Sequence, residues 1–351
     1  MTRFLFTAGG TGGHMFPASV VAEKLMGLGH EVHFLTDVRG ASYLPDSLPF
    51  TALDLSALGK RKWWSLPLVL GQLMVACLYS LSYFIRFKPE KVVGFGGYVT
   101  FPVLLMCKIF GVPYYLHEQN SVMGKVNRWF SRTAMCIMTS FPDTIPDTGE
   151  LVYTGLPVRE SLHALSAEKY ETPAKEFNVL VIGGSQGASI FSTTIPPALR
   201  MLSERVPIPI HVHQQCRAGD LDFVAQAYKD SKITAHTDVF FQDMKQAYKN
   251  AHIVICRAGA SSIAELCLVG KPALLVPFAK AMDDHQTLNA QFITKNQAGW
   301  SMAEADFTPE VLVNLLQKLI QDQDLLMQAS VAMKKLGQPE ATNKIVSQVT
   351  R

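Results

Sequence analysis

The sequence predicts an α/β protein built from two doubly wound, Rossmann-like domains in tandem. The chain has 351 residues, which is too long for one average domain. Strand-like runs alternate with helical stretches throughout, as in parallel sheets with helices on both faces. Both halves open alike, since residues 4–14 (FLFTAGGTGGH) and 179–188 (VLVIGGSQGA) each join an apolar strand to a glycine-rich turn and a helix.

In the first half, short apolar runs predict strands, and the stretches between them predict helices. The expected strands are residues 4–7, 31–36, 91–94 and 114–117, and the expected helices are residues 18–28 and 103–110.

The second half repeats this pattern. The expected strands are residues 179–182, 210–214, 253–256 and 273–276, and the expected helices are residues 191–202 and 221–228. The junction is expected within 155–174, so the domains are predicted at 1–158 and 159–336. The end of the chain, from 308, is expected to be helical with a break near 337–339. Its final helix, 337–351, is expected to pack on the first domain.

Composition excludes several classes of protein. Apolar residues make up 48% of the chain and charged residues 17%, which is unlike a disordered protein. The six cysteines form no C-x-x-C pair, so we expect neither a disulfide scaffold nor a cysteine zinc site, and a reducing compartment fits better. The first eight residues lead directly into a glycine cluster, so no secretion signal is expected.

Charge is unevenly distributed. Residues 60–132 contain ten Lys and Arg but only Glu90 and Glu118 as acids, which gives this stretch a net charge of +8. The stretch is either a solvated basic face or a surface that meets an anionic partner.

Residues 66–85 carry no charge, and their length alone would suit a transmembrane helix. A spanning helix would, however, place the next strand of the sheet beyond the bilayer. The remaining alternatives are a buried core helix and a helix lying on a membrane surface. Trp63 and Trp64 with basic residues at both ends favour the membrane surface.

The first glycine loop, GGTGGH (9–14), suits close approach of a ligand to the backbone at the start of a helix. Pro17 is expected in the first turn of that helix. A dinucleotide fingerprint would need a third glycine at Met15, although Asp37 would suit a ribose. The helix dipole disfavours a positive charge at His14, so a neutral imidazole could accept a proton there. A structural histidine bonded to the loop is the alternative.

Polar residues also follow other strands. His117, Glu118, Gln119 and Asn120 come at a strand end, where α/β proteins place their ligands. They do not form H-E-x-x-H, because Ser121 stands where the second histidine is needed, so zinc is not expected. No loop ends in the Lys-Ser/Thr of a P-loop, which argues against an ATPase of that kind.

The segment CRAGASSIAEL (256–266) is expected to form a strand, a turn and a helix. Its turn could present donors to a diphosphate, and Glu265 could accept two hydrogen bonds from a ribose. Alternatively, Ser262 could cap the helix with Glu265 reaching back. The segment DDHQTLNA (283–290) suits a sugar, or it is a solvated helix start.

Taken together, these motifs resemble a known family. GGTGGHxxPA, GGY before a proline, HEQN, GLPVR, GGSQGA, CRAGASSIAE and HQxxNA occur in this order over residues 9–290. The chain thus resembles the MurG-type N-acetylglucosaminyltransferases, which convert undecaprenyl-pyrophosphoryl-MurNAc-pentapeptide (lipid I) to lipid II in peptidoglycan synthesis. The resemblance implies a GT-B fold, with lipid I held by the first domain and UDP-GlcNAc mainly by the second across an interdomain cleft.

The resemblance also implies site residues. Matched position by position, the UDP-GlcNAc contacts would be Thr11, Gly12, Gly13, Asn120, Arg159, Ser185, Phe241, Ala260, Ser261, Ser262, Ile263, Ala264, Glu265 and Gln286. Phe241 would lie against uracil, Glu265 would take the ribose hydroxyls, and Gln286 would take the GlcNAc hydroxyls. One departure is His285, where the family has glutamine. The others are Phe95 in the second glycine loop, GFGGY (94–98), and Phe101, which follows that loop.

The implied reaction is an inverting transfer in which the C4 hydroxyl of MurNAc displaces UDP. His14 is the candidate base and Glu118 the second candidate. No metal, Asp-x-Asp chelate or cofactor is expected, so helix N-termini and Arg159 would stabilise the leaving diphosphate. Expected partners are an anionic membrane surface at the cytoplasmic face and other cell-wall synthesis proteins, but no nucleic acid. Alternatives are another UDP-sugar enzyme of this fold (an epimerase or glycolipid synthase), a noncatalytic nucleotide-binding scaffold, and an oxidoreductase.

Overall fold

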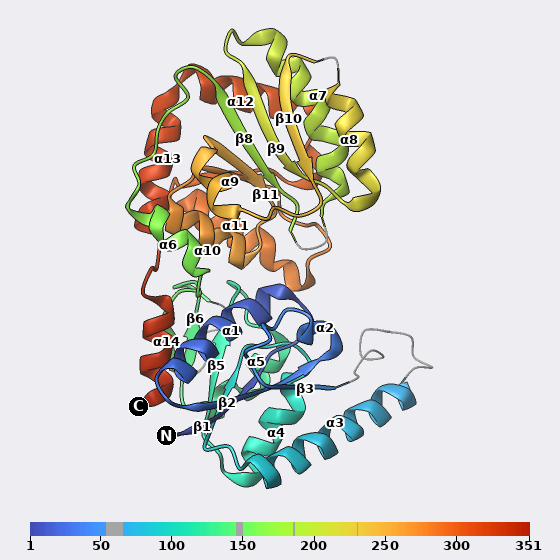
Figure 1. The fold of residues 1–351 in the computed structure, drawn as a ribbon, viewed down its shortest axis with the longest axis vertical. Helices are drawn as coiled ribbons and strands as arrows, with labels where there is room; N and C mark the ends of the chain where they lie inside the picture. The colour runs from blue at the N-terminus through green and yellow to red at the C-terminus, as the bar shows by residue number, and fades with distance from the viewer. Residues whose placement is uncertain (54–65, 145–149, 185–186, 230) are drawn as a thin grey trace. The chain divides into compact units, whose positions relative to one another are not determined.

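The computed structural model describes residues 1–53, 66–144, 150–184, 187–229 and 231–351. For residues 66–70 and Met282 it describes the backbone but not the side chains. The chain forms two compact units. Unit 1 comprises Met1–Val158 with Glu340–Arg351, and unit 2 comprises Arg159–Pro339. Each unit is a parallel sheet with helices on both faces (Figure 1).

The sheet of unit 1 has the strand order β3-β2-β1-β4-β5-β6-β7, with every described pair parallel. The strand order reverses between β1 and β4, which is where a doubly wound sheet opens a ligand site at its carboxyl edge. The strands are β1 Arg3–Thr7, β2 Glu31–Asp37, β3 Phe50–Leu53, β4 Lys91–Gly94, β5 Tyr114–Glu118, β6 Ile137–Thr139 and β7 Leu151–Tyr153.

Helices cover both faces of this sheet. They are α1 Gly12–Gly27, α2 Val38–Ala41, α3 Leu66–Phe87, α4 Thr100–Phe110, α5 Lys125–Phe130, a 3-10 turn at Ser131–Thr133, and α14 Ala341–Thr350. Alternation along β1 sets the two cores: Phe4 and Phe6 pack with α1 and α14, and Leu5 packs with α3 and α4. The strands therefore read as continuous apolar runs because both faces are buried.

Helix α1 begins earlier than residue 18, the start expected from the sequence. It begins at Gly12 with Thr11 as N-cap, and Pro17 lies inside it. The expectation that Pro17 occupies the first turn was therefore wrong. The apolar periodicity starts late because the first helical residues are two glycines and His14. As a result, His14 is in the first turn of the helix itself.

Helix α3 presents part of its surface to solvent. Met74, Val75, Leu78 and Tyr79 are each more than half exposed and recur at one- and four-residue spacing, which places them on one helical face. Ala76 and Phe84 are buried and contribute to the core. No helix in the described parts of the chain is long and apolar enough to cross a membrane.

The sheet of unit 2 has the order β10-β9-β8-β11-β12-β13, again parallel, with its reversal between β8 and β11. The strands are β8 Phe177–Ile182, β9 Ile210–Gln215, β10 Ile233–Asp238, β11 Ile253–Cys256, β12 Ala273–Leu275 and β13 Gly299–Ser301. The helices are α6 Glu160–His163, α7 Ser189–Arg205, α8 Leu221–Tyr228, α9 Met244–Asn250, α10 Ala260–Val269, α11 His285–Lys295, α12 Pro309–Gln321 and α13 Gln323–Lys335. Single 3-10 turns lie at Ala164–Ala167, Ala218–Asp220, Met282–Asp284 and Glu304–Asp306.

The main core of unit 2 lies between the sheet and the helices α7 and α12. Phe177, Val179 and Val181 of β8 face Phe191 of α7 and Leu316 of α12. The helical end of the chain is interrupted twice, between α12 and α13 and again after α13, whereas only the second interruption was expected.

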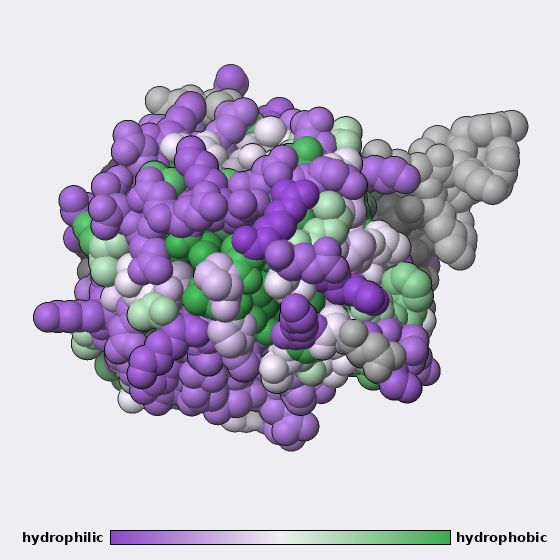
Figure 2. Space-filling view, turned by 90° about the horizontal axis from the view of Figure 1, so that it is seen from above, coloured by the Kyte–Doolittle hydropathy of each residue, from purple (hydrophilic) through white to green (hydrophobic). Residues whose placement is uncertain are grey.

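Figure 2 shows a face of the molecule on which hydrophilic side chains surround a smaller apolar area.

Candidate active site

The loops after β1 and β4 of unit 1 meet at the strand-order reversal. Gly97 has a φ of +88°, and a Cβ atom there would lie 3.0 Å from the carbonyl oxygen of Gly9. Glycine is therefore required on both conformational and steric grounds. This close approach brings the two glycine loops together beside the start of α1.

The Asp37 carboxylate holds these loops together through three hydrogen bonds. Its Oδ1 accepts hydrogen bonds from the backbone amides of Gly10 (3.1 Å) and Gly40 (2.7 Å), and its Oδ2 accepts one from the Tyr98 hydroxyl (2.6 Å). The carboxylate is almost fully buried. Asp37 thus holds three loops together, which weakens the dinucleotide alternative in which it would bind a ribose.

His14 is half-buried in the first turn of α1. Its Nδ1 lies 2.7 Å from Oε1 of Gln119, which follows β5. Two motifs 105 residues apart are thereby joined at the carboxyl edge of the sheet. The position suits an exchange of a proton with a bound hydroxyl.

Glu118 has a different environment. Its Oε1 accepts from the Asn120 amide (3.1 Å), and its Oε2 accepts from the Gly124 amide and from Nδ2 of Asn127, both at 2.9 Å. The residue is 2% exposed. Glu118 therefore organises the loop that carries Asn120 and precedes α5.

In unit 2, Arg159 and Tyr248 converge on Glu265 of α10. Arg159 Nε donates to Glu265 Oε1 at 2.8 Å, and the Tyr248 hydroxyl donates to Oε2 at 2.9 Å. Burial raises the pKa of Glu265, while the charge of Arg159 and both hydrogen bonds act to lower that pKa. Each carboxylate oxygen retains a second lone pair for a ligand donor.

The capping alternative for Glu265 is wrong. Helix α10 begins at Ala260 with Gly259 as its N-cap, so Ser262 lies inside the helix and caps nothing. The side chains of Ser261, Ser262 and Ala264 are half-buried, whereas Ala260, Ile263 and Glu265 are buried. The start of α10 thus carries free amide groups and hydroxyls at the strand-order reversal of unit 2.

The other predicted donor residues are divided between the two units. Ser185 lies outside the described residues. Gln286, in the first turn of α11, accepts from the Phe278 amide at 2.9 Å through its Oε1. Thr11, Gly12, Gly13 and Asn120 belong to unit 1.

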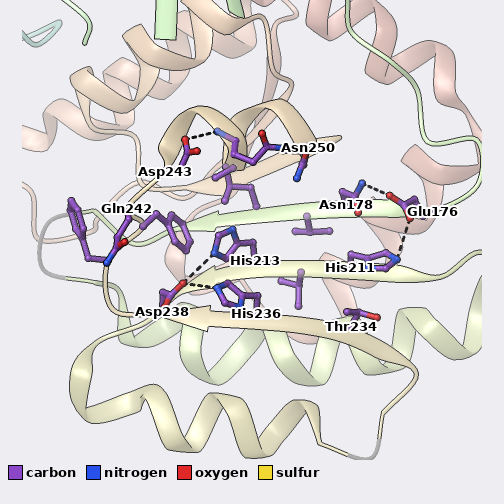
Figure 3. Close-up of a pocket in the computed structure, with 18 residues that line it drawn as sticks. Glu176, Asn178, His211, His213, Thr234, His236, Asp238, Gln242, Asp243 and Asn250 are labelled. Carbon is purple, nitrogen blue, oxygen red and sulfur yellow. Dashed lines mark hydrogen bonds and ion pairs between the residues drawn. The ribbon is translucent and has the colours of Figure 1, made fainter. Parts of the chain in front are cut away.

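Phe241 borders a pocket of about 900 Å³ on the sheet face formed by β8, β9 and β10. The Phe241 ring is buried, with its centroid 4.0 Å from that of His213. Figure 3 shows His213 and His236 pointing toward the Asp238 carboxylate, with Nε2–Oδ2 distances of 3.4 and 2.8 Å. Among the described residues, these three side chains are a cluster whose ligand atoms lie close enough together to hold a metal ion.

The expectation that the chain has no Asp-x-Asp spacing was wrong. Asp220 and Asp222 have it, as do Asp322 and Asp324. Asp220 accepts from the Ser192 hydroxyl at 2.9 Å, and Asp322 stands between α12 and α13. Neither pair follows β8 or β11, the strands that flank the reversal in unit 2.

Comparison with known proteins defines the family. Residues 4–139 match the glycosyltransferase family 28 N-terminal domain, and residues 178–345 match the glycosyltransferase family 28 C-terminal domain. The chain belongs to glycosyltransferase family 28. Each unit of this family 28 enzyme thus matches one of the two family domains. The prediction of a GT-B glycosyltransferase is confirmed.

Relatives within family 28 carry a more specific name. The chain is 38% identical to the UDP-N-acetylglucosamine–N-acetylmuramyl-(pentapeptide) pyrophosphoryl-undecaprenol N-acetylglucosamine transferase of Rhodospirillum rubrum, over 98% of this chain and 90% of the relative. The enzyme of the same name from Rhodospirillum centenum is 37% identical over 99% and 94%. The crystal structure of Acinetobacter baumannii MurG has a TM-score of 0.84 at 31% identity and covers 100% of this chain and 99% of that chain. The resemblance to MurG-type enzymes is therefore confirmed.

More distant structures share the fold alone. The Staphylococcus aureus MnaA structure with UDP has a TM-score of 0.66 at 13% identity, covering 99% of this chain and 95% of that chain.

Several residues that build the site were not predicted from the sequence. Gln119 and His117 were placed within HEQN at a strand end without individual roles, and Tyr248 and Asn127 were not predicted at all. Nothing local marks Tyr248, which reaches Glu265 across 17 residues. The place of Gln119 directly after β5 was recognised from the sequence, but its contact with His14 was not.

Proposed function

We propose that this chain transfers GlcNAc from UDP-GlcNAc to the C4 hydroxyl of lipid I, with inversion, to form lipid II. The observation that carries the proposal is that identity to the named transferase extends over 98% of the chain and so includes both units. An enzyme that shared only the donor sugar with this transferase would need to resemble it only in the half that binds the donor.

We assign donor binding chiefly to unit 2. Glu265 accepts from the ribose hydroxyls, with Arg159 and Tyr248 holding its carboxylate in place. The amides at the start of α10 and the hydroxyls of Ser261 and Ser262 face the diphosphate. Phe241 lies at the uracil, Gln286 binds the GlcNAc hydroxyls, and Ser185, Ile263, Ala264, Thr11, Gly12, Gly13 and Asn120 complete the predicted donor contacts.

The reaction in this proposal is a direct displacement. The C4 oxygen of MurNAc forms a bond to the anomeric carbon of GlcNAc, and the bond to the β-phosphate oxygen breaks with its electron pair going to UDP. His14 takes the hydroxyl proton on an imidazole nitrogen. Amide dipoles at the start of α10 stabilise the charge that grows on the diphosphate. Glu118 is the weaker candidate for the base because both of its oxygens already accept hydrogen bonds.

The test is to follow UDP release from UDP-GlcNAc with and without a short-chain lipid I analogue. We expect release only with the analogue, together with a disaccharide product. Release without it, or formation of a C2 epimer, would instead favour a different UDP-sugar enzyme of this fold.

We further propose that unit 1 binds an anionic membrane surface from the cytoplasmic side, where lipid I must be reached. Besides the exposed apolar face of α3, unit 1 exposes Ile109 and Phe110 at the end of α4, by 63% and 46%. Unit 1 also exposes basic side chains in α3, α4 and α5 and directly after α3 and α5. They are Arg86, Lys88, Lys108, Lys125, Arg128 and Arg132. Apolar side chains entering the headgroup region with cations beside them are typical of peripheral membrane binding. Other cell-wall synthesis proteins remain proposed partners of this enzyme.

A further inference from the structure

A chain of hydrogen bonds lies behind His14 within unit 1. It runs from the Gly155 carbonyl through His117 and Gln119 to Nδ1 of His14. We infer that Gln119 and His117 are positioning residues that hold His14 in the tautomer with its proton on Nδ1, which leaves the Nε2 lone pair to accept the proton of the acceptor hydroxyl. This inference deepens the proposed function and rests on it for the role of Nε2.

The first link fixes His117. Its Nε2 lies 3.1 Å from the carbonyl oxygen of Gly155, which also accepts the Thr154 hydroxyl at 3.0 Å. A carbonyl oxygen can only accept, so Nε2 of His117 must carry the proton. In a neutral ring, Nδ1 of His117 is then an acceptor.

The second link fixes the amide of Gln119. Its Nε2 lies 3.2 Å from Nδ1 of His117 and 3.2 Å from the backbone oxygen of His117. Both of these atoms are acceptors, so the amide nitrogen, rather than the amide oxygen, must face them. The flipped orientation would set an oxygen against two acceptors.

The third link fixes His14. With its nitrogen toward His117, Gln119 presents Oε1 to Nδ1 of His14 at 2.7 Å. An amide oxygen cannot donate, so Nδ1 of His14 must carry the proton. The available lone pair of a neutral His14 ring is therefore on Nε2.

The surroundings keep this arrangement in one state. His117 is fully buried and stacked on the Phe95 ring with centroids 5.1 Å apart. Burial lowers the pKa of His117 to about 4, so its Nδ1 remains an acceptor at neutral pH. Gly96 lies beside the His14 ring, since a Cβ atom at Gly96 would be 3.6 Å from Cε1.

An amide is a suitable partner for a base that must stay neutral until it acts. The Gln119 oxygen orients the ring without a charge that would attract a proton beforehand. When the C4 hydroxyl attacks, its proton moves to Nε2, and the resulting imidazolium keeps its Nδ1–H bond to the amide. A carboxylate at this position would set an oxygen against the two acceptor atoms of His117 and so disturb the arrangement that orients His14.

The direct test is ¹⁵N NMR of the full-length protein with labelled histidine, with His14 assigned from a His14→Gln variant. We expect the wild-type ring, in its neutral form, to be protonated on Nδ1. In Gln119→Leu we expect the proton to move to Nε2 in a substantial part of the molecules. A neutral wild-type ring protonated on Nε2 would overturn the inference.

Kinetics supply the second arm. With UDP-GlcNAc and a short-chain lipid I analogue, Gln119→Leu and Gln119→Glu should each lower kcat at least about tenfold while the KM for UDP-GlcNAc changes less than about twofold. Gln321→Leu, at the exposed last residue of α12, is the matched control and should behave as wild type. An unchanged kcat and tautomer in Gln119→Leu would refute the positioning role. If the wild type formed no lipid II yet showed the Nδ1-protonated ring, the proposed function would fail while the tautomer assignment would stand.

Discussion

Arg159 and Glu265 lie 106 residues apart in sequence, yet Nε of Arg159 is 2.8 Å from Oε1 of Glu265. The carboxylate is nearly enclosed, whereas the guanidinium is about one-third exposed. Arg159 therefore compensates a buried charge and remains able to reach a ligand. The same pair connects the first residue of unit 2 to the helix that we assign to donor binding.

Replacing Glu265 should weaken donor binding. In Glu265→Gln, the ribose and Tyr248 lose a charged acceptor, and Arg159 loses its ion pair. We expect the Kd for UDP to rise at least about tenfold, which corresponds to roughly 1.4 kcal/mol. Isothermal titration calorimetry measures this change. Glu168→Gln, which removes an exposed ion pair with Lys249, should leave the Kd unchanged. Unaltered binding by Glu265→Gln would show that this carboxylate does not contact the nucleotide.

Removing the His14 ring should affect chemistry rather than donor binding. We expect His14→Ala to lower kcat by roughly 10²–10⁴-fold, the range for loss of a general base, with the Kd for UDP-GlcNAc nearly unchanged. Steady-state assays with a lipid I analogue and calorimetry with UDP-GlcNAc separate the two effects. His163→Ala, near the start of unit 2, serves as the matched histidine control. Wild-type turnover in His14→Ala would eliminate His14 as the base.

The exposed face of α3 should be needed for membrane binding. Leu78 is 62% exposed, and Leu78→Asp should reduce sedimentation with vesicles that contain anionic lipid. Val331→Asp places the same charge at a 48% exposed position of α13 and should have no effect.

The exposed basic residues of unit 1 should contribute to membrane binding through their charge. Each is expected to add about 1 kcal/mol near an anionic surface, so Lys108→Gln should lower vesicle affinity by about fivefold, and the difference should shrink at high salt. Equal binding to neutral and anionic vesicles at every salt concentration would contradict the electrostatic part of the proposal.

Stability should fall in mild acid because of buried histidines. Burial lowers the pKa of His117 to about 4 from an ordinary 6.5, so the folded protein binds fewer protons than the unfolded chain between these values. The stability is then complete above pH 6.5 and is lost as the pH falls toward 4. For His117 alone the loss at pH 5 is about 2 kcal/mol.

The same direction applies to two other histidines, since burial also lowers the pKa of His33 and of His252 to about 4. Melting temperatures recorded from pH 7.5 to 5 measure the combined effect. In His117→Gln the pH dependence should be shallower than in the wild type. An equal slope in both proteins would mean that His117 is not shielded from protonation.

Much of the fold could be predicted from the sequence because buried parallel strands are distinctive. The runs that become β1, β4, β8 and β11 are apolar on both faces and precede glycine turns. Other strands lack this signal: β13 has three residues, and β10 reads ITAHTD with polar side chains toward solvent. These strands form because a neighbouring strand offers a paired edge, which the local sequence does not reveal.

The site was predictable in its parts rather than in its connections. Glycine loops and polar residues at strand ends identify His14, Glu118 and Glu265 as candidates. Their partners are set by tertiary structure: Gln119 meets His14 across 105 residues, and Arg159 meets Glu265 across 106. These pairings depend on which strands are neighbours in each sheet, and that order follows from packing.

The last helix has a consequence for how the protein is made. Ile345, Val346 and Val349 of α14 belong to the core of unit 1, whose other residues come from the beginning of the chain. During translation, the first 158 residues therefore emerge without a part of their own interior. Unit 1 can complete its core only after α14 has been synthesised, so a truncation before residue 340 would damage the unit whose other residues are made first.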